Sequence, residues 1–426
     1  MHIARALLGL AFFCFVAWLM SSHKKRFPWR VVFGGIGAQL VLAFLILGTK
    51  YGQAFFQTLS DFFYKLVGMA EPGAKMVFGA LADGEKMAEV FGGESSFIFA
   101  FAGRGLVLII FFSALMAILY HLGVMQFLIY ILARVMSVLM GVSGAESMAM
   151  AANVFVGQTE APLVVKPYLA KMTTSELNAL MCGGFATIAG SVLAVYVSYL
   201  GADYGPHLLT ASVMSAPAAF VMAKILQPET ELSATAGTVE FKVERTANNV
   251  IEAAANGTSD GLKLWLNVCA MLIAFVALVA LVDWPLGAIG NLLSIDNLSL
   301  SKLFGWVFAP VAWFMGVDSW HDCQLFGGLL GTKVAVNEFV AFLQLKELAG
   351  LTDSASAVVF ESARTTKMAA YALCGFANFA SVGIQIGGIS PLAPERKTDL
   401  SRLALRAMLG GAFASWMTAT VAGMFL

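Results

Sequence analysis

Charged residues are scarce in this sequence, since Asp, Glu, Lys and Arg make up 12% of its 426 residues. A soluble domain of ordinary composition carries about 25%. The 26 basic residues balance the 26 acidic ones, so the formal net charge is zero. Proteins that bind nucleic acid concentrate positive charge against the phosphates, and this balance gives no reason to expect a nucleic acid as a partner.

Cysteine is also scarce, and the five cysteines stand singly among apolar or small residues, at Cys14, Cys182, Cys269, Cys323 and Cys374. The sequence has no Cys-x-x-Cys pair and no Cys/His cluster, so it offers neither a disulfide framework nor a zinc site. It also lacks a Gly-rich phosphate loop, a nucleophile elbow and a metalloprotease motif. We therefore expect a protein that is not an enzyme.

Apolar residues are abundant instead, because 59% of the chain is hydrophobic and the mean hydropathy is +0.81. Several almost uncharged runs approach the roughly 20 residues that cross a lipid bilayer as a helix. We predict an all-α polytopic membrane protein with eight transmembrane helices, near 3–21, 31–49, 98–122, 178–200, 206–226, 262–282, 365–388 and 404–425.

Four further segments are less regular than these spans. Residues 51–67 place Phe and Leu at helical spacing with polar residues between them, which predicts an amphipathic helix at the membrane interface. Residues 70–96 indicate a connector, and hydropathy leaves open whether 124–140 crosses the membrane. The mixed charges of 228–260 indicate a loop that contains a helix near 243–255 and ends before the sixth span.

Two stretches interrupt the apolar pattern with Gly and charged residues, at 141–172 and 308–345. The first contains Gly157-Gln-Thr-Glu-Ala-Pro162, in which three polar side chains follow a Gly in a run of apolar and small residues. Broken backbone and polar side chains are costly inside a membrane and usually serve a function there. We predict that both stretches are re-entrant hairpins.

The two hairpins open similar units of the chain. Met140-Gly-Val142 at the start of the first matches Met315-Gly-Val317 at the start of the second. Farther along, residues 182–192 match 374–382 when two one-residue gaps are allowed. Each unit runs as hairpin, span, span, and this shared order predicts an internal repeat.

Basic residues gather in two loops, 22–30 and 391–406, and both should be cytoplasmic. Two loops on the same side require an even number of membrane crossings between them. This count places the N- and C-termini on the periplasmic side and the loop 228–260 inside. The first hairpin then opens inward and the second outward, so the repeats are inverted. Inverted repeats with discontinuous helices are the plan of secondary transporters.

Polar residues that can bind a solute gather in the hairpins and in the spans that follow them. They are Gln158, Thr159 and Glu160 in the first hairpin, Asn337 and Glu338 in the second, Thr187 and Ser191 at i, i+4, and Asn378 and Ser381 at i, i+3. Gly residues beside Thr187 and Asn378 permit local unwinding, which frees backbone carbonyls for an ion or a substrate.

The nearest basic residues to the hairpin tips are Lys166 and Lys333, which we expect to pair locally or to mark the hairpin ends. An anionic substrate would call for a nearby Arg clamp, so a neutral solute with hydroxyl and amide groups fits better. The cluster of Asp318, His321 and Asp322 indicates a polar hairpin end rather than a metal site. A carrier for a dicarboxylate or an amino acid, a membrane-embedded enzyme and a channel remain alternatives on these residues alone.

Three segments together resemble the signature motifs of the concentrative nucleoside transporter family. They are Gly157-Gln-Thr-Glu-Ala-Pro162, Val336-Asn-Glu-Phe-Val340 and Cys374-Gly-Phe-Ala-Asn-Phe-Ala-Ser381. The resemblance runs from the first span to the eighth and is to the bacterial-type members. It implies a homotrimer whose protomers have eight spans, two re-entrant hairpins and interfacial helices.

The resemblance also implies an elevator-type transporter, in which a transport domain moves against a scaffold. The scaffold would comprise residues 1–140 and 228–307. The transport domain would comprise the first repeat, 141–227, and the second, 308–426. We expect the protein to import nucleosides across the bacterial inner membrane, with uridine-like substrates; a preference for purines or pyrimidines is left open.

The positions of the three motifs also indicate which residues would form the binding sites. The resemblance implies that Gln158, Thr159 and Glu160 face the nucleobase, with Val192 and Phe376 packed around it, and that Glu338, Asn378 and Ser381 hold the ribose hydroxyls. It places a coupling Na⁺ on the Asn153 side chain, the carbonyls of Val156 and Ile188, and both the hydroxyl and the carbonyl of Thr187. The family pattern often has Ser in place of Thr187, and the hydroxyl is kept. Proton coupling, or an elevator carrier for another small polar solute, is the alternative.

Overall fold

The computed structural model describes residues 2–83, 86, 105–237, 247–295, 297–351 and 358–426, and these contain helices and no strand. Within these ranges, five helices are long and apolar enough to cross a membrane, or six if one bent pair counts as a single span. The predicted all-helical architecture is therefore confirmed. The predicted span at 98–122 begins outside the described residues, those at 178–200 and 365–388 are each broken into two helices, and that at 404–425 lies mostly within one continuous helix.

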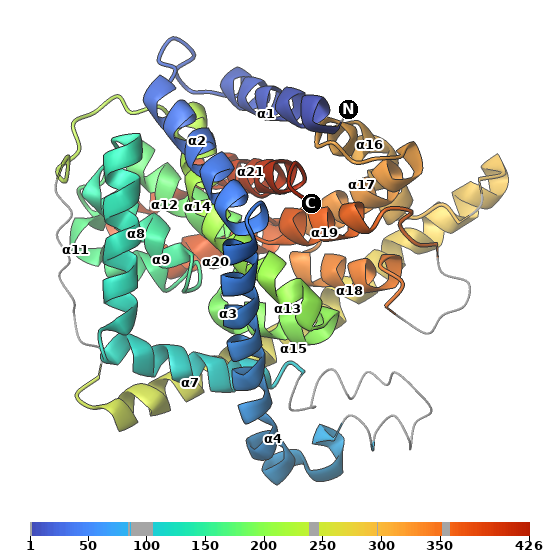
Figure 1. Cartoon of the computed structure of the whole chain (residues 1–426), viewed down its shortest axis with the longest axis horizontal. Helices are drawn as coiled ribbons and strands as arrows, with labels where there is room; N and C mark the ends of the chain where they lie inside the picture. The colour runs from blue at the N-terminus through green and yellow to red at the C-terminus, as the bar shows by residue number, and fades with distance from the viewer. Residues whose placement is uncertain (1, 84–85, 87–104, 238–246, 296, 352–357) are drawn as a thin grey trace.

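The N-terminal part of the chain crosses the top of the view in Figure 1 and then descends through its centre to the bottom. It begins with α1 (His2–Leu19) and α2 (Trp29–Leu47), which correspond to the first two predicted spans. The amphipathic segment is α3 (Lys50–Met69), whose first turn is capped by the Thr49 hydroxyl and which buries little of its surface. The connector after it contains α4 (Glu71–Phe78) and a short 3-10 turn, Gly79–Ala82. The interfacial position of α3 stays a prediction.

Residues 124–140, which hydropathy left open, form a helix of their own. This is α8 (Val124–Met140), and it makes an angle of 76° with the preceding α7 (Leu108–His121). The chain turns at Gly123, whose φ of +83° is a conformation that other residues rarely adopt. The bend directs α8 away from α7, as Figure 1 shows.

The expected helix near 243–255 begins outside the described residues, and its described part from Val250 on is one element with the predicted sixth span rather than a separate helix. The structure has one helix of 44 residues, α15 (Val250–Leu293), which begins at the Asn249 cap. Its polar first turns continue into the apolar part without a break. Gly257 and Gly261 let it approach α7, because a Cβ atom on Gly257 would lie 2.6 Å from the Ser113 carbonyl oxygen. Close packing on α7 therefore extends a helix whose first turns resemble a loop by composition.

The first repeat, residues 141–227, has the predicted order of hairpin and two spans. Its hairpin consists of α9 (Gly144–Asn153) and the short helices α10 (Ala161–Val164) and α11 (Lys166–Leu169). The next span is broken into α12 (Thr174–Ala186) and α13 (Gly190–Leu200). After the 3-10 turn Ala202–Tyr204 comes the continuous helix α14 (Gly205–Leu226).

The second repeat, residues 308–426, follows the same order with one difference at its start. Residues 308–314 belong to a preceding helix, α16 (Leu300–Phe314), so they are not part of the broken stretch as predicted. The hairpin is α17 (Trp320–Ala335) with α18 (Glu338–Leu348), and the broken span is α19 (Ala363–Leu373) with α20 (Phe379–Ile389). After the 3-10 turn Pro394–Arg396, the chain ends in α21 (Lys397–Ala422).

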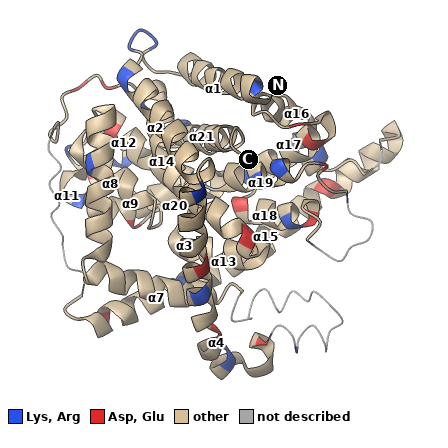
Figure 2. Ribbon diagram, in the orientation of Figure 1, with Lys and Arg blue, Asp and Glu red and all other residues tan. Residues whose placement is uncertain are grey.

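The interior of the molecule is built from helices of both repeats. Almost every residue of α12 and α14 is buried, as is the C-terminal half of α21, whereas α15 buries few of its side chains. α21 packs against both α12 and α14, which places the last helix of repeat two inside repeat one. Most of the ribbon carries no charge, and the charged residues lie mainly toward helix ends and connecting segments (Figure 2).

A buried ion pair holds the start of the first hairpin on the end of α14. Lys224 Nζ lies 2.6 Å from the Glu146 carboxylate, and both side chains are buried. Glu146 also completes a capping box with Ser143 at the start of α9, and Glu176 forms a second one with Thr173 at the start of α12. These contacts fix where the hairpin and the broken span begin, and hence where their interrupted ends meet.

Candidate functional site

The breaks in the two broken spans lie against each other near the middle of the molecule. The first break separates Ala186 from Gly190, and the second separates Leu373 from Phe379. Gly375 in the second break has φ of +143°, and a Cβ atom there would lie 2.8 Å from the Phe185 carbonyl oxygen. Only Gly allows this approach, which brings the unwound backbone of both repeats together.

The Glu338 carboxylate lies at the start of α18 and is buried. The Tyr196 hydroxyl donates to its Oε1 at 3.1 Å, and the Asn378 Nδ2 donates to its Oε2 at 2.9 Å. Asn337 caps the same helix by accepting from the Val340 N–H at 2.8 Å. A carboxylate can accept about four hydrogen bonds, so Glu338 keeps acceptor capacity for the hydroxyl groups of a solute.

The second break presents Asn378 to Glu338. The Asn378 Oδ1 accepts from the Ser381 N–H at 2.8 Å and so caps α20, which fixes the direction of its amide. Ser381 is buried beside it, and Phe376 is partly buried within the break. The structure therefore brings Glu338, Asn378 and Ser381 together, as the sequence predicts.

Tyr196 is a contact that the sequence reasoning did not single out. It lies in α13 one helical turn after Val192, which is also buried. Spacing of i, i+4 places the two residues on one face of the helix, and this was the available signal. Tyr196 joins repeat one to the hairpin of repeat two through its bond to Glu338.

The tip of the first hairpin meets the second repeat at α20. A Cβ atom on Gly388 would lie 2.7 Å from the Thr159 Cγ2, so Thr159 packs directly on that helix. Gln158 is buried, and within the described part of the chain its Oε1 has no hydrogen-bond partner. Glu160 is exposed. The three predicted residues therefore occupy one tip, with an unused acceptor at Gln158.

Gln385 is a second residue that the sequence reasoning missed. It lies in α20 one turn after Ser381, and its Nε2 donates to the Met181 carbonyl of α12 at 3.1 Å. A Cβ atom on Gly184 would meet both this Nε2 and the Gln158 Cβ, so the two glutamines are neighbours. Its Oε1 is also buried and has no partner among the described residues. Two neighbouring glutamines thus each have an amide oxygen without a partner among the described residues.

Oxygen atoms suited to a cation lie where the first hairpin runs along the first break. Asn153 ends α9 and donates from Nδ2 to the Ala149 carbonyl at 3.0 Å, while its buried Oδ1 has no partner among the described residues. A Cβ atom on Gly183 would lie 3.1 Å from the Asn153 Nδ2, and the Gly190 N–H donates to the Phe155 carbonyl at 3.1 Å. α9 therefore ends against the break.

The other predicted ion ligands belong to the same two interruptions. Val156 follows α9, and Thr187 and Ile188 occupy the break between α12 and α13. The Thr187 Oγ1 donates to the Gly183 carbonyl at 2.9 Å, which leaves its oxygen lone pairs for other partners. Amide, hydroxyl and carbonyl oxygens are hard ligands of the kind that suit an alkali cation.

The acidic cluster at the start of the second hairpin has a structural role. Asp318 pairs with Arg364 at 2.8 Å, and Asp322 accepts from the Glu361 N–H at 2.9 Å. These contacts tie the start of α17 to the start of α19. They agree with the interpretation of Asp318, His321 and Asp322 as a polar hairpin end.

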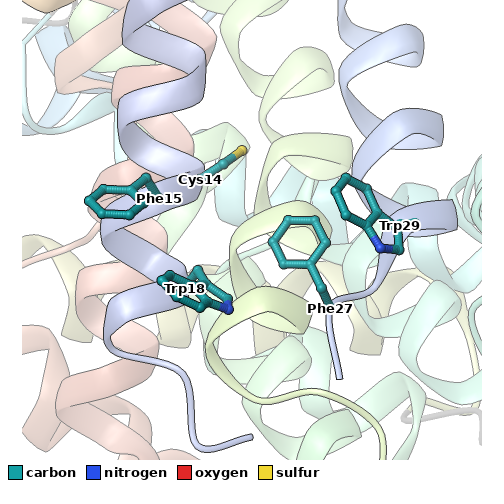
Figure 3. Close-up of a pocket in the computed structure, with 5 residues that line it drawn as sticks. All are labelled: Cys14, Phe15, Trp18, Phe27 and Trp29. Atoms are coloured by element: carbon teal, nitrogen blue, oxygen red, sulfur yellow. The ribbon is translucent and has the colours of Figure 1, made fainter. Parts of the chain in front are cut away.

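An apolar hollow lies apart from these residues, between α1 and the start of α2 (Figure 3). Its volume is about 300 Å³, and it is lined by Cys14, Phe15, Trp18, Phe27 and Trp29. None of these side chains is charged, and four are aromatic. The hollow therefore lacks the convergent acceptors that the hairpin tips and breaks provide.

Models of one family match three parts of the chain. The C-terminal part of the Na⁺-dependent nucleoside transporter model matches residues 207–423, its N-terminal part matches 8–81, and a model described as nucleoside recognition matches 104–203. The chain belongs to the Na⁺-dependent nucleoside transporter family. Sodium is thus the coupling ion of its family, and the protein is a transporter rather than an enzyme.

Relatives support this membership over the whole chain. An uncharacterized transporter of Haemophilus influenzae is 41% identical over 100% of this chain and 98% of its own. Solute carrier family 28 member 3 of Mus musculus is 42% identical over 98% of this chain and 58% of its own. Sodium/nucleoside cotransporter 1 of Rattus norvegicus is 40% identical over 98% and 63%. The chain therefore spans about three-fifths of these two mammalian relatives.

Solved structures of one protein, CNTnw, share the fold. Its inward-facing, substrate-bound structure is 40% identical, covers 100% of this chain and 98% of its own, and has a TM-score of 0.90. A substituted form in an intermediate state is 41% identical, covers 100% of both chains and has a TM-score of 0.92. The family resemblance predicted from the three motifs is confirmed.

Proposed function

We propose that this protein is a symporter that uses a sodium gradient to import nucleosides. The observation that carries the proposal is the meeting of two acceptor sets at the paired breaks. One includes Asn153, whose Oδ1 has no partner among the described residues, and the other is the Glu338 carboxylate, which Tyr196 and Asn378 hold in place. Membership of the nucleoside transporter family supplies the class of solute and the ion.

In this proposal the ion binds between the end of α9 and the first break. Its ligands are the Asn153 Oδ1, the carbonyls of Val156 and Ile188, and the hydroxyl and carbonyl of Thr187. The support is local, because Asn153 is buried with an unused acceptor and the break beside it is not helical. An unpaired buried acceptor is costly, and a bound cation offsets that cost.

The nucleoside binds between the hairpin tips. Gln158, Thr159 and Glu160 face the base with Val192 and Phe376 around it, while Glu338, Asn378 and Ser381 hold the ribose. A carboxylate can accept two hydrogen bonds from a vicinal diol, and an amide can match the donor and acceptor edge of a base. A uridine-like nucleoside has both groups.

The two sites are coupled through a short piece of backbone. Only Gly157 separates Val156 from Gln158, so ordering the end of α9 around an ion also orders the tip that meets the base. A ligand shifts a conformational equilibrium only by its differential affinity for the two states. We infer that bound ion and nucleoside satisfy the polar groups of the hairpin tips and so lower the free energy of moving these groups across the membrane.

The proposed movement is that of an elevator, with residues 141–227 and 308–426 as the transport domain and residues 1–140 and 228–307 as the scaffold. Close similarity to CNTnw, which has been solved in inward- and outward-facing states, supports it. Most of the apolar surface of α15 is unburied within the protomer, which suits contact with lipid or with partner copies in a homotrimer. The predicted location is a bacterial inner membrane, with both termini periplasmic.

Uptake of radiolabelled uridine into proteoliposomes tests the proposal. An inward sodium gradient should drive uridine above its external concentration, and a proton gradient at equal sodium should not. Liposomes without protein provide the background, and a dicarboxylate provides the control solute. Uptake that ignores the sodium gradient, or no uptake of any nucleoside, would contradict the proposed function.

A further inference from the structure

Lys333 is a buried cation in the second repeat that the proposed transport cycle does not use. It lies in the last turn of α17 and has no exposed surface. Its Nζ donates to the Ala372 carbonyl oxygen at 2.8 Å and to the Ser415 Oγ at 2.6 Å. Ser415 donates its own hydroxyl hydrogen to the Ala412 carbonyl at 2.9 Å, so toward Lys333 it acts as an acceptor.

The position of these acceptors is specific. Ala372 is the last but one residue of α19, and the final carbonyls of a helix lack intrahelical donors and carry the negative end of its dipole. The second break follows at once and ends with Asn378, which donates to Glu338. The Lys333 ammonium therefore binds the helix end from which the break reaches the substrate site.

In the first repeat, too, the end of the hairpin helix contacts the last turn of the first helix of the broken span, but a different side chain lies at the contact. There the end of the first hairpin helix, at Asn153, meets the last turn of α12, at Gly183. In the second repeat the end of α17, at Lys333, meets the last turn of α19, at Ala372. Repeat one offers an oxygen without a partner among the described residues, whereas repeat two fills the corresponding place with the Lys333 Nζ, which donates to two oxygens.

We propose that Lys333 is a positioning residue whose tethered ammonium does in repeat two what the coupling sodium does in repeat one. It holds the C-terminal end of α19 through oxygen acceptors and so sets the direction in which the second break presents Asn378 to Glu338. Burying a charge inside a membrane protein is costly, and such a residue is a functional candidate by default. This inference rests on the proposed binding of sodium at Asn153 and Thr187.

The substitution Lys333→Met removes the charge and keeps a flexible side chain of similar length. Uptake is measured twice, against uridine at saturating sodium and against sodium at saturating uridine. We expect the KM for uridine to rise about ten-fold, the size of losing a charge-assisted hydrogen bond. The sodium concentration for half-maximal uptake should change less than about two-fold, because the ion site in repeat one is intact. The matched control is Lys397→Met, which removes an exposed lysine at the start of α21.

A second variant keeps the test decisive if Lys333→Met fails to fold. Ser415→Ala retains the lysine and removes one of its two acceptors, so the KM for uridine should rise about three-fold. An unchanged KM in the folded variants, or an equal change in the uridine and sodium constants, would overturn the role of Lys333. Absence of sodium-driven uridine uptake in the unsubstituted protein would instead overturn the proposed function.

Discussion

The two repeats share an order of elements but treat their polar groups differently. In repeat two Glu338 has two donors and Lys333 has two acceptors, although the amide oxygens of Gln344 and Gln385 have no partner among the described residues. In repeat one, within the described residues, Asn153 and Gln158 each leave a buried oxygen without a partner. The Glu338 carboxylate of repeat two is therefore preorganised, whereas the Asn153 and Gln158 oxygens of repeat one need a ligand to complete them.

This difference suggests a division of labour between the repeats. A preorganised carboxylate binds hydroxyl groups without first being ordered, which favours affinity and selectivity. An incomplete site responds to what binds it, because a ligand shifts the population toward the completed state. We infer that repeat two mainly selects the substrate, while repeat one senses the ion and transmits its presence to the hairpin tip.

Of the substitutions that test this comparison, that of Glu338 should raise the KM for uridine the most. Glu338→Gln replaces an acceptor by an amide donor, which must face the Tyr196 hydroxyl or the Asn378 amide. The Tyr196 hydroxyl can rotate to accept from the Gln amide, but the ribose hydroxyls lose a charged acceptor, which costs about 3 kcal/mol, or about 100-fold in uridine KM. Uptake assays against uridine concentration measure it, and Glu347→Gln, at an exposed position of the same helix, is the control. A KM like that of the unsubstituted protein would remove Glu338 from the site.

Substitution of Thr187, in repeat one, should have an intermediate effect, and on the sodium dependence of uptake. Thr187→Ala removes a proposed ion ligand, so the sodium concentration for half-maximal uptake should rise about ten-fold. The KM for uridine at saturating sodium should stay near its original value. Thr420→Ala is a matched control, since Thr420 also donates to the carbonyl four residues before it. A rise in uridine KM without a change in sodium dependence would contradict the division between repeats.

The smallest rise in the KM for uridine should come from removing the hydrogen bond between Tyr196 and Glu338, which joins the repeats. Tyr196→Phe removes one of the two donors to Glu338 and should raise the KM for uridine about five-fold, the value of a hydrogen bond worth about 1 kcal/mol. Titration of uridine binding by calorimetry measures it directly. Tyr371→Phe, which removes another buried hydroxyl that pairs with His207, should leave the affinity unchanged. Equal losses in both variants would mean that tyrosine hydroxyls here only stabilise the fold.

Much of this arrangement is predictable from the sequence because breaks in a membrane helix leave a local signature. Gly and polar residues inside apolar runs mark both hairpins, and Gly-flanked Thr187 and Asn378 mark both broken spans. Spacing placed Asn378 and Ser381 on one face, the family resemblance added Glu338, and the structure brings the three together. The roles assigned to them by family resemblance stay proposals.

Other features depend on contacts between distant segments, which the sequence does not display. Tyr196 reaches Glu338 across 142 residues, and Gln385 reaches Met181 across 204. The single helix α15 was missed because its polar first turns resemble a loop, and its packing on α7 is a contact between distant segments. Lys333 was expected to pair locally or to mark a hairpin end; it lies in the last turn of α17, and its acceptors lie 39 and 82 residues away.

The central claim is that sodium binding in repeat one orders the nucleoside site, which residues of both repeats form. Uridine affinity of the purified protein, titrated by calorimetry in sodium chloride and in choline chloride of equal ionic strength, tests it most directly. The account predicts at least about ten-fold tighter binding in sodium, which corresponds to a coupling free energy of about 1.4 kcal/mol. Equal affinity in the two salts would contradict it.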